Sequence, residues 1–204
     1  AAGGAFFNAG QVCAATGFVL AHASVVDRLC EMLVARAAEH VLGNPLDPAT
    51  TMGPLNNAKV AAKVLAHVDD AVAQGARLLH GGRARPDLGS DLFFEPTVVR
   101  DVTPDMRLCR EETFGPVVPV VAFQDEAEAL ALALQNAYGL SVGVFTQDIS
   151  RGIAMAKRIP AGIVNINAGT TWWEIHLPFG GGSGKQSGIG RLGGMHTLEA
   201  MTEI

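Results

Sequence analysis

The sequence has few charged residues and no cluster of basic ones. Charged side chains make up 17% of its 204 residues, against about 25% in an average chain. The 15 lysines and arginines are spread along the chain, and the formal net charge is -5. A nucleic-acid surface needs clustered basic side chains to neutralise phosphates, so nucleic acid is excluded as the main partner. So little surface charge also predicts that one face packs against another protein surface.

Long apolar runs, paired cysteines and histidine ligand spacing are also absent. No run reaches the about 18 apolar residues of a membrane-spanning helix, and the first seven residues lack a basic signal-peptide region. The three cysteines are far apart, which favours neither a disulfide framework nor a zinc site, and the scattered histidines are expected at the surface or as caps. We therefore expect a cytoplasmic protein with no metal and no membrane partner. The cysteines are Cys13, Cys30 and Cys109.

Short apolar segments alternate with helix-like patterns along the chain. The expected strands cover residues 16–21, 76–80, 93–99, 117–123, 141–145 and 163–166. The expected helices cover residues 25–41, 57–74, 126–135, 150–158 and 197–201, with Ser24 as the N-cap of the first. Alternation of this length indicates βαβ units. It predicts an α/β fold with an open, largely parallel sheet flanked by helices, in a single domain over residues 1–204.

Two glycine-rich segments look like phosphate-binding loops but fail in detail. In residues 184–187 a glutamine follows Lys185, where a P-loop needs serine or threonine. Residues 188–193 match G-x-G-x-x-G, yet no expected strand leads into them, and 11 residues after them leave no room for a βαβ unit. Neither segment predicts a dinucleotide-binding fold.

Cys13 is a candidate nucleophile. Gly10 leaves backbone space near the thiol, and no acidic residue is close in sequence to disfavour the thiolate. A helix starting nearby would favour the thiolate through its dipole. A small, buried apolar cysteine is the equally open alternative.

Residues 110–116, which read REETFGP, form a second dense polar segment. Adjacent side chains point in different directions, so one of Glu111 and Glu112 could face a polar ligand while the other pairs with Arg107 or Arg110. Two solvated loop acids are the alternative. The Gly-Pro pair then fixes the turn into the strand at Val117.

Five segments resemble motifs of the aldehyde dehydrogenase superfamily and occur in that family's order. They are residues 7–13 (FNAGQVC), 43–55 (GNPLDPATTMGPL), 111–117 (EETFGPV), 136–141 (NAYGLS) and 178–188 (PFGG followed by KQSG). The resemblance implies that Cys13 attacks an aldehyde, that the thiohemiacetal passes a hydride to NAD or NADP, and that water hydrolyses the resulting thioester. The main-chain N–H of Cys13 would form part of the oxyanion site.

The resemblance also implies roles for other residues. Glu112 would hold the nicotinamide-side ribose, and Phe114 would pack beside the nicotinamide. Four residues would line the aldehyde tunnel, with the two tryptophans at 172 and 173 favouring an apolar or aromatic substrate. These four are Val12, Ala14, Trp173 and Phe179.

The sequence departs from the family pattern at three places. Residues 182–184 lengthen the spacer between Gly181 and Lys185. Only 12 residues precede Cys13, and the first is not methionine, whereas in the family the cofactor-binding domain and the acid that activates water come before the nucleophile. The family also continues beyond the position of Ile204 into a strand that pairs subunits. We therefore expect the catalytic portion of a homo-oligomeric enzyme without its cofactor-binding domain, inactive or weakly active alone.

Two other functions remain open from the sequence. A cysteine hydrolase acting on esters would need a histidine near Cys13, for which His176 is a candidate. A non-catalytic interaction domain would need only a complementary partner.

Overall fold

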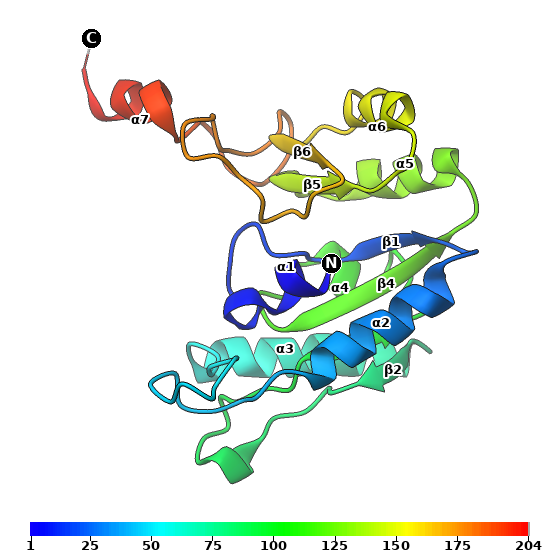
Figure 1. Cartoon of the computed structure of the whole chain (residues 1–204), viewed down its shortest axis with the longest axis vertical. Coiled ribbons are helices and arrows are strands. Elements are labelled where there is room, and N and C mark those ends of the chain that lie inside the picture. The colour runs from blue at the N-terminus through cyan, green and yellow to red at the C-terminus, as the bar shows by residue number, and fades with distance from the viewer. Residues whose placement is uncertain (204) are drawn as a thin grey trace. The chain divides into compact units, whose positions relative to one another are not determined.

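The computed structural model describes residues 1–203 and divides the chain into two compact units, Ala1–Ala129 and Leu130–Ile204 (Figure 1). Unit 1 contains α1 (Ala2–Phe6), the 3-10 helix η1 (Phe7–Gly10), β1 (Val19–His22), α2 (Val26–Ala38), α3 (Ala58–Ala73), β2 (Arg77–His80), the 3-10 helix η2 (Pro86–Leu88), β3 (Thr97–Arg100), α4 (Arg107–Arg110) and β4 (Val117–Phe123). Helix α5 (Glu126–Gln135) runs through the boundary, and unit 2 continues with β5 (Ser141–Val144), α6 (Ile149–Ala156), β6 (Ile163–Ile166) and α7 (Gly194–Met201). The single nucleophile-bearing domain stays a prediction beside this division.

The sheet of unit 1 has the strand order β1-β4-β3-β2. β4 pairs in parallel with β1 and with β3, and β2 joins the edge antiparallel to β3. The valines of β3 and β4 are buried whether their side chains point to one face or the other. Continuous burial of this kind is typical of a parallel strand covered on both faces.

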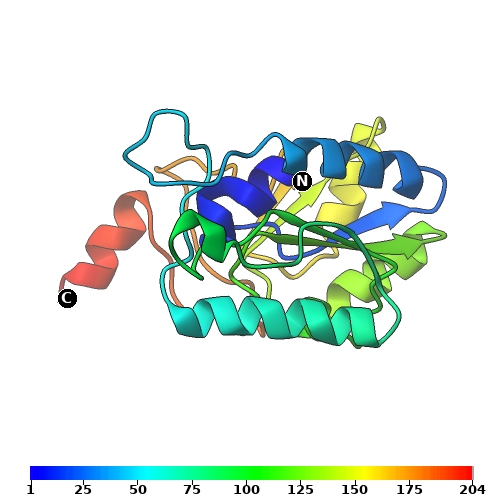
Figure 2. The same ribbon diagram turned by 90° about the horizontal axis from the view of Figure 1, so that it is seen from below.

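Helices α2 and α3 cover opposite faces of this sheet, as Figure 2 shows. Each buries one stripe at helical spacing, and the stripe of α3 consists of Val64, His67, Val68 and Ala71. The side chain of Asn57 accepts a hydrogen bond from the Val60 N–H at 3.0 Å and so caps the start of α3.

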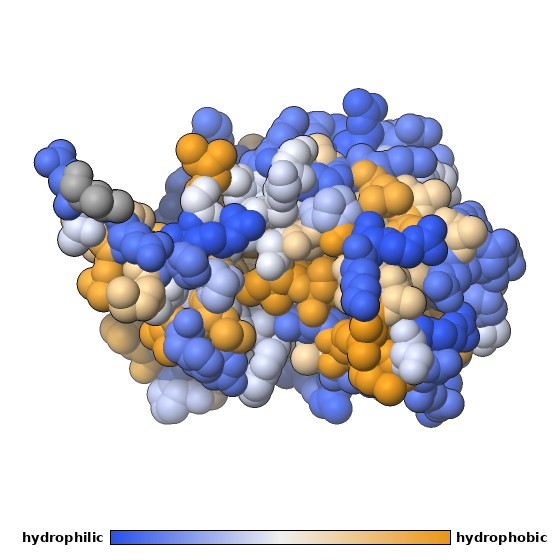
Figure 3. All heavy atoms as spheres, turned by 90° about the horizontal axis from the view of Figure 1, so that it is seen from above, coloured by the Kyte–Doolittle hydropathy of each residue, from blue (hydrophilic) through white to orange (hydrophobic). Residues whose placement is uncertain are grey.

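Unit 2 is built on the parallel pair β5-β6, with α6 as the crossover between the two strands. Asp148 caps α6 by accepting hydrogen bonds from the N–H groups of Ser150 and Arg151. Many large apolar side chains of this unit are exposed to solvent. They include Phe145, Trp172, Trp173, Ile175, Ile189, Met195 and Met201. Figure 3 shows apolar residues, in orange, on the surface that it draws.

The predicted α/β class with a largely parallel sheet is confirmed. The predicted strands at 117–123 and 163–166 and the helix at 126–135 have the observed bounds. Ser24 as an N-cap is wrong, because α2 follows Val25 and the Ser24 hydroxyl instead lies 2.7 Å from Nδ1 of His22. The expected strand at 93–99 is shorter and shifted, since the strand covers Thr97–Arg100, while Phe94 forms an isolated bridge with Ala84. Within residues 1–203, no helix combines the length and apolarity that crossing a membrane requires.

Candidate active site

Cys13 lies on an exposed turn that follows a strained stretch of backbone. Asn8, Ala9 and Gly10 have φ values of 50°, 54° and 71°, and for non-glycine residues this left-handed region costs roughly 1–2 kcal/mol each. The strain is held by local bonds, since the Gln11 N–H donates to the Asn8 carbonyl and the Asn8 side chain donates to the Gln11 carbonyl, both at 3.1 Å. Backbone strain of this kind in a loop is typical of a functional site.

The helix considered near Cys13 is not there. The residues after η1 form a turn in which the Ala15 N–H donates to the Val12 carbonyl at 2.9 Å, and α2 begins only at Val26. A helix dipole therefore does not act on this thiol. Cys13 is nevertheless exposed, unlike buried Cys30, and burial raises the pKa of the Cys109 thiol to about 12. Of the three cysteines, Cys13 is the accessible one, and the small buried alternative is wrong.

Gly10 brings the nucleophile segment against the EETFGP segment. A Cβ atom on Gly10 would lie 2.1 Å from the Gly115 carbonyl oxygen, so the two backbones touch. Gly115 is equally confined, because a Cβ there would lie 2.3 Å from a methyl group of Val64 on α3. The two motifs that carry Cys13 and Glu112 thus contact each other in unit 1, and the second also packs on α3.

Side chains of α3 and α4 hold three consecutive residues of the EETFGP segment. Arg107 donates to the Glu111 carboxylate at 2.8 and 3.1 Å. The Lys63 ammonium donates to the Glu112 carbonyl at 3.0 Å, and Nδ1 of His67 lies 3.0 Å from the Thr113 hydroxyl. The backbone around Glu112 is therefore fixed from both sides.

Glu111 and Glu112 differ in whether their carboxylates are paired. The hydrogen bond from Arg107 lowers the pKa of Glu111, which stays ionised as its partner. Glu112 is exposed, and its carboxylate forms no hydrogen bond or ion pair with any other residue in the described range 1–203. The carboxylate of Glu112 is thus available to accept hydrogen bonds from a ligand. Phe114, two residues on, is half-buried with a left-handed φ of 57°.

His67 is a site residue that the sequence reading missed. It was expected at the surface or as a cap, but its side chain is fully buried on α3, with Nε2 3.3 Å from Glu111 Oε2. Burial lowers the pKa of this imidazole, and the nearby Arg107 lowers it further, against the opposing effect of Glu111. The signal in the sequence was its position on the apolar stripe with Val64 and Val68.

Unit 2 places two of the expected tunnel residues in contact. The rings of Trp173 and Phe179 lie 4.9 Å apart at an interplanar angle of 48°, and the backbone of Phe179 pairs with Leu192. The other two expected tunnel residues, Val12 and Ala14, flank Cys13 in unit 1 and are half-buried.

The lysine of the glycine-rich segment has a structural contact. The Lys185 ammonium donates to the Leu134 carbonyl at 2.9 Å and to the Asn136 carbonyl, so it ties residues 178–188 to residues 136–141. The Gly139 N–H donates to the Ser187 hydroxyl at 2.9 Å across the same junction. These two motifs therefore form one assembly in unit 2.

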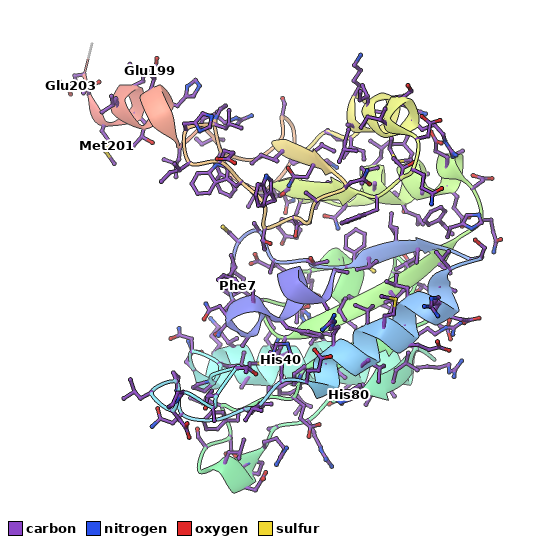
Figure 4. The ribbon with its side chains drawn as sticks, viewed as in Figure 1. Phe7, His40, His80, Glu199, Met201 and Glu203 are labelled. Carbon is purple, nitrogen blue, oxygen red and sulfur yellow. The ribbon has the colours of Figure 1, made fainter. Side chains whose placement is uncertain are left out.

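A hollow in unit 1 is formed around α1 and η1, and Cys13 does not line it. It is lined by Gly3, Phe6, Phe7, Asn8, His40 and Thr51, of which Figure 4 labels Phe7 and His40. None of the residues expected at the site lines it. Among residues 1–203, no three histidine, cysteine or acidic side chains gather as a metal site would require.

Comparison with known proteins decides the family. The model of the aldehyde dehydrogenase family matches residues 1–204. The chain belongs to the aldehyde dehydrogenase family. Betaine aldehyde dehydrogenase from Brucella anthropi is 43% identical over 203 residues, and vanillin dehydrogenase from Pseudomonas fluorescens is 40% identical over 204. These alignments cover 98% and 100% of the chain but 41% of each relative.

Solved aldehyde dehydrogenases have the same fold. The NAD+ complex of the aldehyde dehydrogenase from Bacillus cereus superposes with a TM-score of 0.92 at 38% identity, over 99% of this chain and 40% of that one. The NAD+ complex of betaine aldehyde dehydrogenase from Staphylococcus aureus gives a TM-score of 0.91 at 40% identity, over 98% and 39%. The chain thus spans about two-fifths of the length of these family members.

Proposed function

We propose that residues 1–204 form the thiol-bearing portion of an NAD-dependent aldehyde dehydrogenase that oxidises an aldehyde to a carboxylate. The observation that carries the proposal is the contact between Gly10 and Gly115, which joins the segment of exposed Cys13 to the segment of unpaired Glu112. The alternative, a hydrolase using His176, stays a prediction, since His176 belongs to unit 2 and Cys13 to unit 1.

Cys13 supplies the nucleophile. Its thiolate adds to the aldehyde carbonyl carbon and forms a thiohemiacetal, whose oxygen carries negative charge as the C–S bond forms. The Cys13 N–H donates no hydrogen bond to another residue in the described part of the chain, so it can donate to that oxygen. After oxidation Cys13 holds the acyl group as a thioester, and attack by water releases the carboxylate and returns the thiol.

Glu112 and Phe114 fit the cofactor expected from the family. A carboxylate that is exposed and unpaired can accept hydrogen bonds from both hydroxyls of a ribose, and a half-buried aromatic ring nearby can cover a planar ring. NAD, when bound, supplies the acceptor for the hydride that the thiohemiacetal loses. The NAD+ complexes of the related Bacillus cereus and Staphylococcus aureus enzymes favour NAD over NADP.

The substrate is an aldehyde with an apolar or aromatic body. The resemblance to the family assigns Val12 and Ala14, which flank the thiol, to the substrate tunnel. It also assigns Trp173 and Phe179, whose apolar rings contact each other. Among the relatives, vanillin dehydrogenase is named for an aromatic aldehyde, whereas the betaine aldehyde dehydrogenases are named for one with a quaternary ammonium group.

The remaining parts of the reaction come from outside residues 1–204 in this proposal. The sequence contains no E-x-G-G-[KN] motif before Cys13 to supply the acid that activates water, and no strand leads into residues 188–193. We infer a dinucleotide-binding domain as partner and a homo-oligomer as the working form. Residues 1–204 alone should therefore be acylated at Cys13 by an activated ester, which needs no oxidant, but should reduce little NAD with an aldehyde.

A chimera tests the proposal. Residues 1–204 replace the matched 40% of the Bacillus cereus enzyme, and NADH formation is followed with aromatic and aliphatic aldehydes. We expect aldehyde-dependent NADH in the chimera, none after Cys13→Ser, and full activity after Cys109→Ser. A folded chimera that oxidises no aldehyde, or whose activity survives Cys13→Ser, would contradict the proposal.

A further inference from the structure

The motif at residues 43–55 has no chemical role so far, although it is among the longest that the chain shares with its family. Its end is firmly held. Leu55 is buried, its N–H donates to the Leu92 carbonyl at 2.8 Å, and Asn57 starts α3 as its cap. Pro54 and Asn56 therefore sit on a fixed piece of backbone, which we name the 54–56 platform.

The side chain of Gln11 reaches this platform from the nucleophile segment. Its Oε1 accepts the Asn56 N–H at 2.7 Å, and its Nε2 lies 3.4 Å from the Pro54 carbonyl. The same Nε2 lies 3.3 Å from the Asn8 carbonyl, inside the left-handed stretch. A single amide thus connects the strained backbone before Cys13 to a rigid part of unit 1.

Two backbone hydrogen bonds also hold the turn that carries Cys13. Within the turn, the Ala15 N–H donates to the Val12 carbonyl, and after it the Thr16 N–H donates to the Gly4 carbonyl at 3.2 Å. The bonds between Asn8 and Gln11 are local and link the segment only to itself. On the side that precedes Cys13, the Gln11 amide is the long-range polar tie seen among the described residues.

We propose that Gln11 is a positioning residue for the reaction, which holds the Cys13 thiol and main-chain N–H in place by docking on the 54–56 platform. The inference rests on the proposed role of Cys13. Its physical basis is that attack needs the sulfur and the oxyanion donor aligned at once, and a displacement of about 1 Å can cost 10²-fold in rate. The motif at residues 43–55 then acts on catalysis through Gln11.

Two reagents separate positioning from simple exposure of the thiol. Acylation of Cys13 by p-nitrophenyl acetate passes through an oxyanion and needs the N–H in place, whereas alkylation by iodoacetamide forms a C–S bond with loss of iodide and needs only the thiolate. Both rates are measured at Cys13 by mass spectrometry on the 204-residue chain. The variants are Gln11→Met, which keeps the length without the hydrogen bonds, and Gln11→Asn, which keeps the amide but is one methylene shorter.

Gln74→Met is the matched control, since Gln74 lies beyond the end of α3 and bonds only within that helix. We expect Gln11→Met and Gln11→Asn to lower the acylation rate about 10-fold or more and the alkylation rate by less than about 2-fold. Gln74→Met should change neither. Thermal unfolding of each variant confirms that it folds.

Each contrary result overturns a stated claim. If both Gln11 variants fold and are acylated at the unaltered rate, Gln11 does not position the thiol, although Cys13 is still the nucleophile. If the acylation and alkylation rates fell equally, the positioning role would also be wrong, because a change in the accessibility of the thiol would explain both losses. An unaltered chain that is alkylated but never acylated at Cys13 would overturn the proposed function and this inference with it.

Discussion

A Cβ atom added to Gly10 would stand 2.1 Å from the carbonyl oxygen of Gly115, closer than any two such atoms can approach. The contact joins two motifs that are about a hundred positions apart in the chain. Because Gly10 also has a φ of 71°, glycine is required there for two independent reasons.

Gly10→Ala should therefore destabilise the chain and misplace the thiol. We expect a loss of about 1–3 kcal/mol in unfolding free energy from the φ strain and the clash together. Acylation of Cys13 should fall with it. Denaturant unfolding and the burst of p-nitrophenolate measure the two effects.

The matched control is Gly17→Ala, on the same segment. A Cβ at Gly17 meets no atom within 4 Å, so the change should cost less than about 0.5 kcal/mol. Equal unfolding curves for the two alanine variants would show that the Gly10–Gly115 contact does not constrain the site.

Glu112→Gln should weaken binding of the nicotinamide half of the cofactor. The amide removes the charge that strengthens hydrogen bonds to a ribose, and charged hydrogen bonds contribute about 1.5–3 kcal/mol, which corresponds to about 10-fold or more in Kd. Titration of the chain with nicotinamide mononucleotide, followed by NMR, measures the change. Glu111→Gln is the control, because Glu111 is already paired with Arg107. If binding weakened only in Glu111→Gln, the ribose would bind Glu111, and the role proposed for Glu112 would be wrong.

Burial of His67 makes stability depend on pH. Its pKa is lowered in the folded chain, and the groups that face it are Lys63 on its own helix, Arg107 on α4 and Glu111 in the loop. The unfolded chain therefore binds more protons at this position, so stability is present at neutral pH and is lost as pH falls below about 6.5.

His67→Gln should flatten this dependence, because glutamine keeps a polar end toward Thr113 and does not titrate between neutral and acid pH. Thermal unfolding midpoints from about pH 7 to pH 5 give the slope. His40, whose pKa burial also lowers, should leave a residual slope. His196→Gln, at an exposed position on α7, is the control. A slope as steep in His67→Gln as in the unaltered chain would contradict the account.

The tunnel assignment is tested in the chimera. Trp173→Ala should raise the KM for an aromatic aldehyde several-fold while kcat changes less, because the ring pair with Phe179 supplies apolar contact to the substrate. Ile189→Ala, at a fully exposed position of the same unit, should leave both constants unchanged. If the two substitutions had equal effects on KM, the prediction that Trp173 lines the tunnel would be wrong.

The regular elements follow from local patterns in the sequence. Helix α3 could be predicted almost to the residue because its apolar stripe begins after the capping Asn57 and ends before Gly75. The strand β4 is a continuous apolar run and was equally clear. The short helices α1, η1 and α4 were missed, because segments of one turn have no periodicity to detect.

The contacts that build the site depend on tertiary structure and could not be predicted in this way. No local pattern shows that Gly10 meets Gly115 or that Gln11 reaches Pro54 and Asn56. The sequence predicts His67 at the surface or as a cap, since histidine is only intermediate in its tendency to be buried, although its place on the apolar stripe of α3 is visible. The motifs identified which residues matter, and the fold shows which of them touch.

The most direct test of the central claim is to identify the cysteine that becomes acylated. The 204-residue chain is treated with p-nitrophenyl acetate at neutral pH, and the acyl group is located by peptide mass spectrometry. We predict one acyl group per chain, on Cys13, formed equally in Cys109→Ser and absent in Cys13→Ser. Acylation at another residue, or a burst that persists in Cys13→Ser, would contradict Cys13 as the nucleophile.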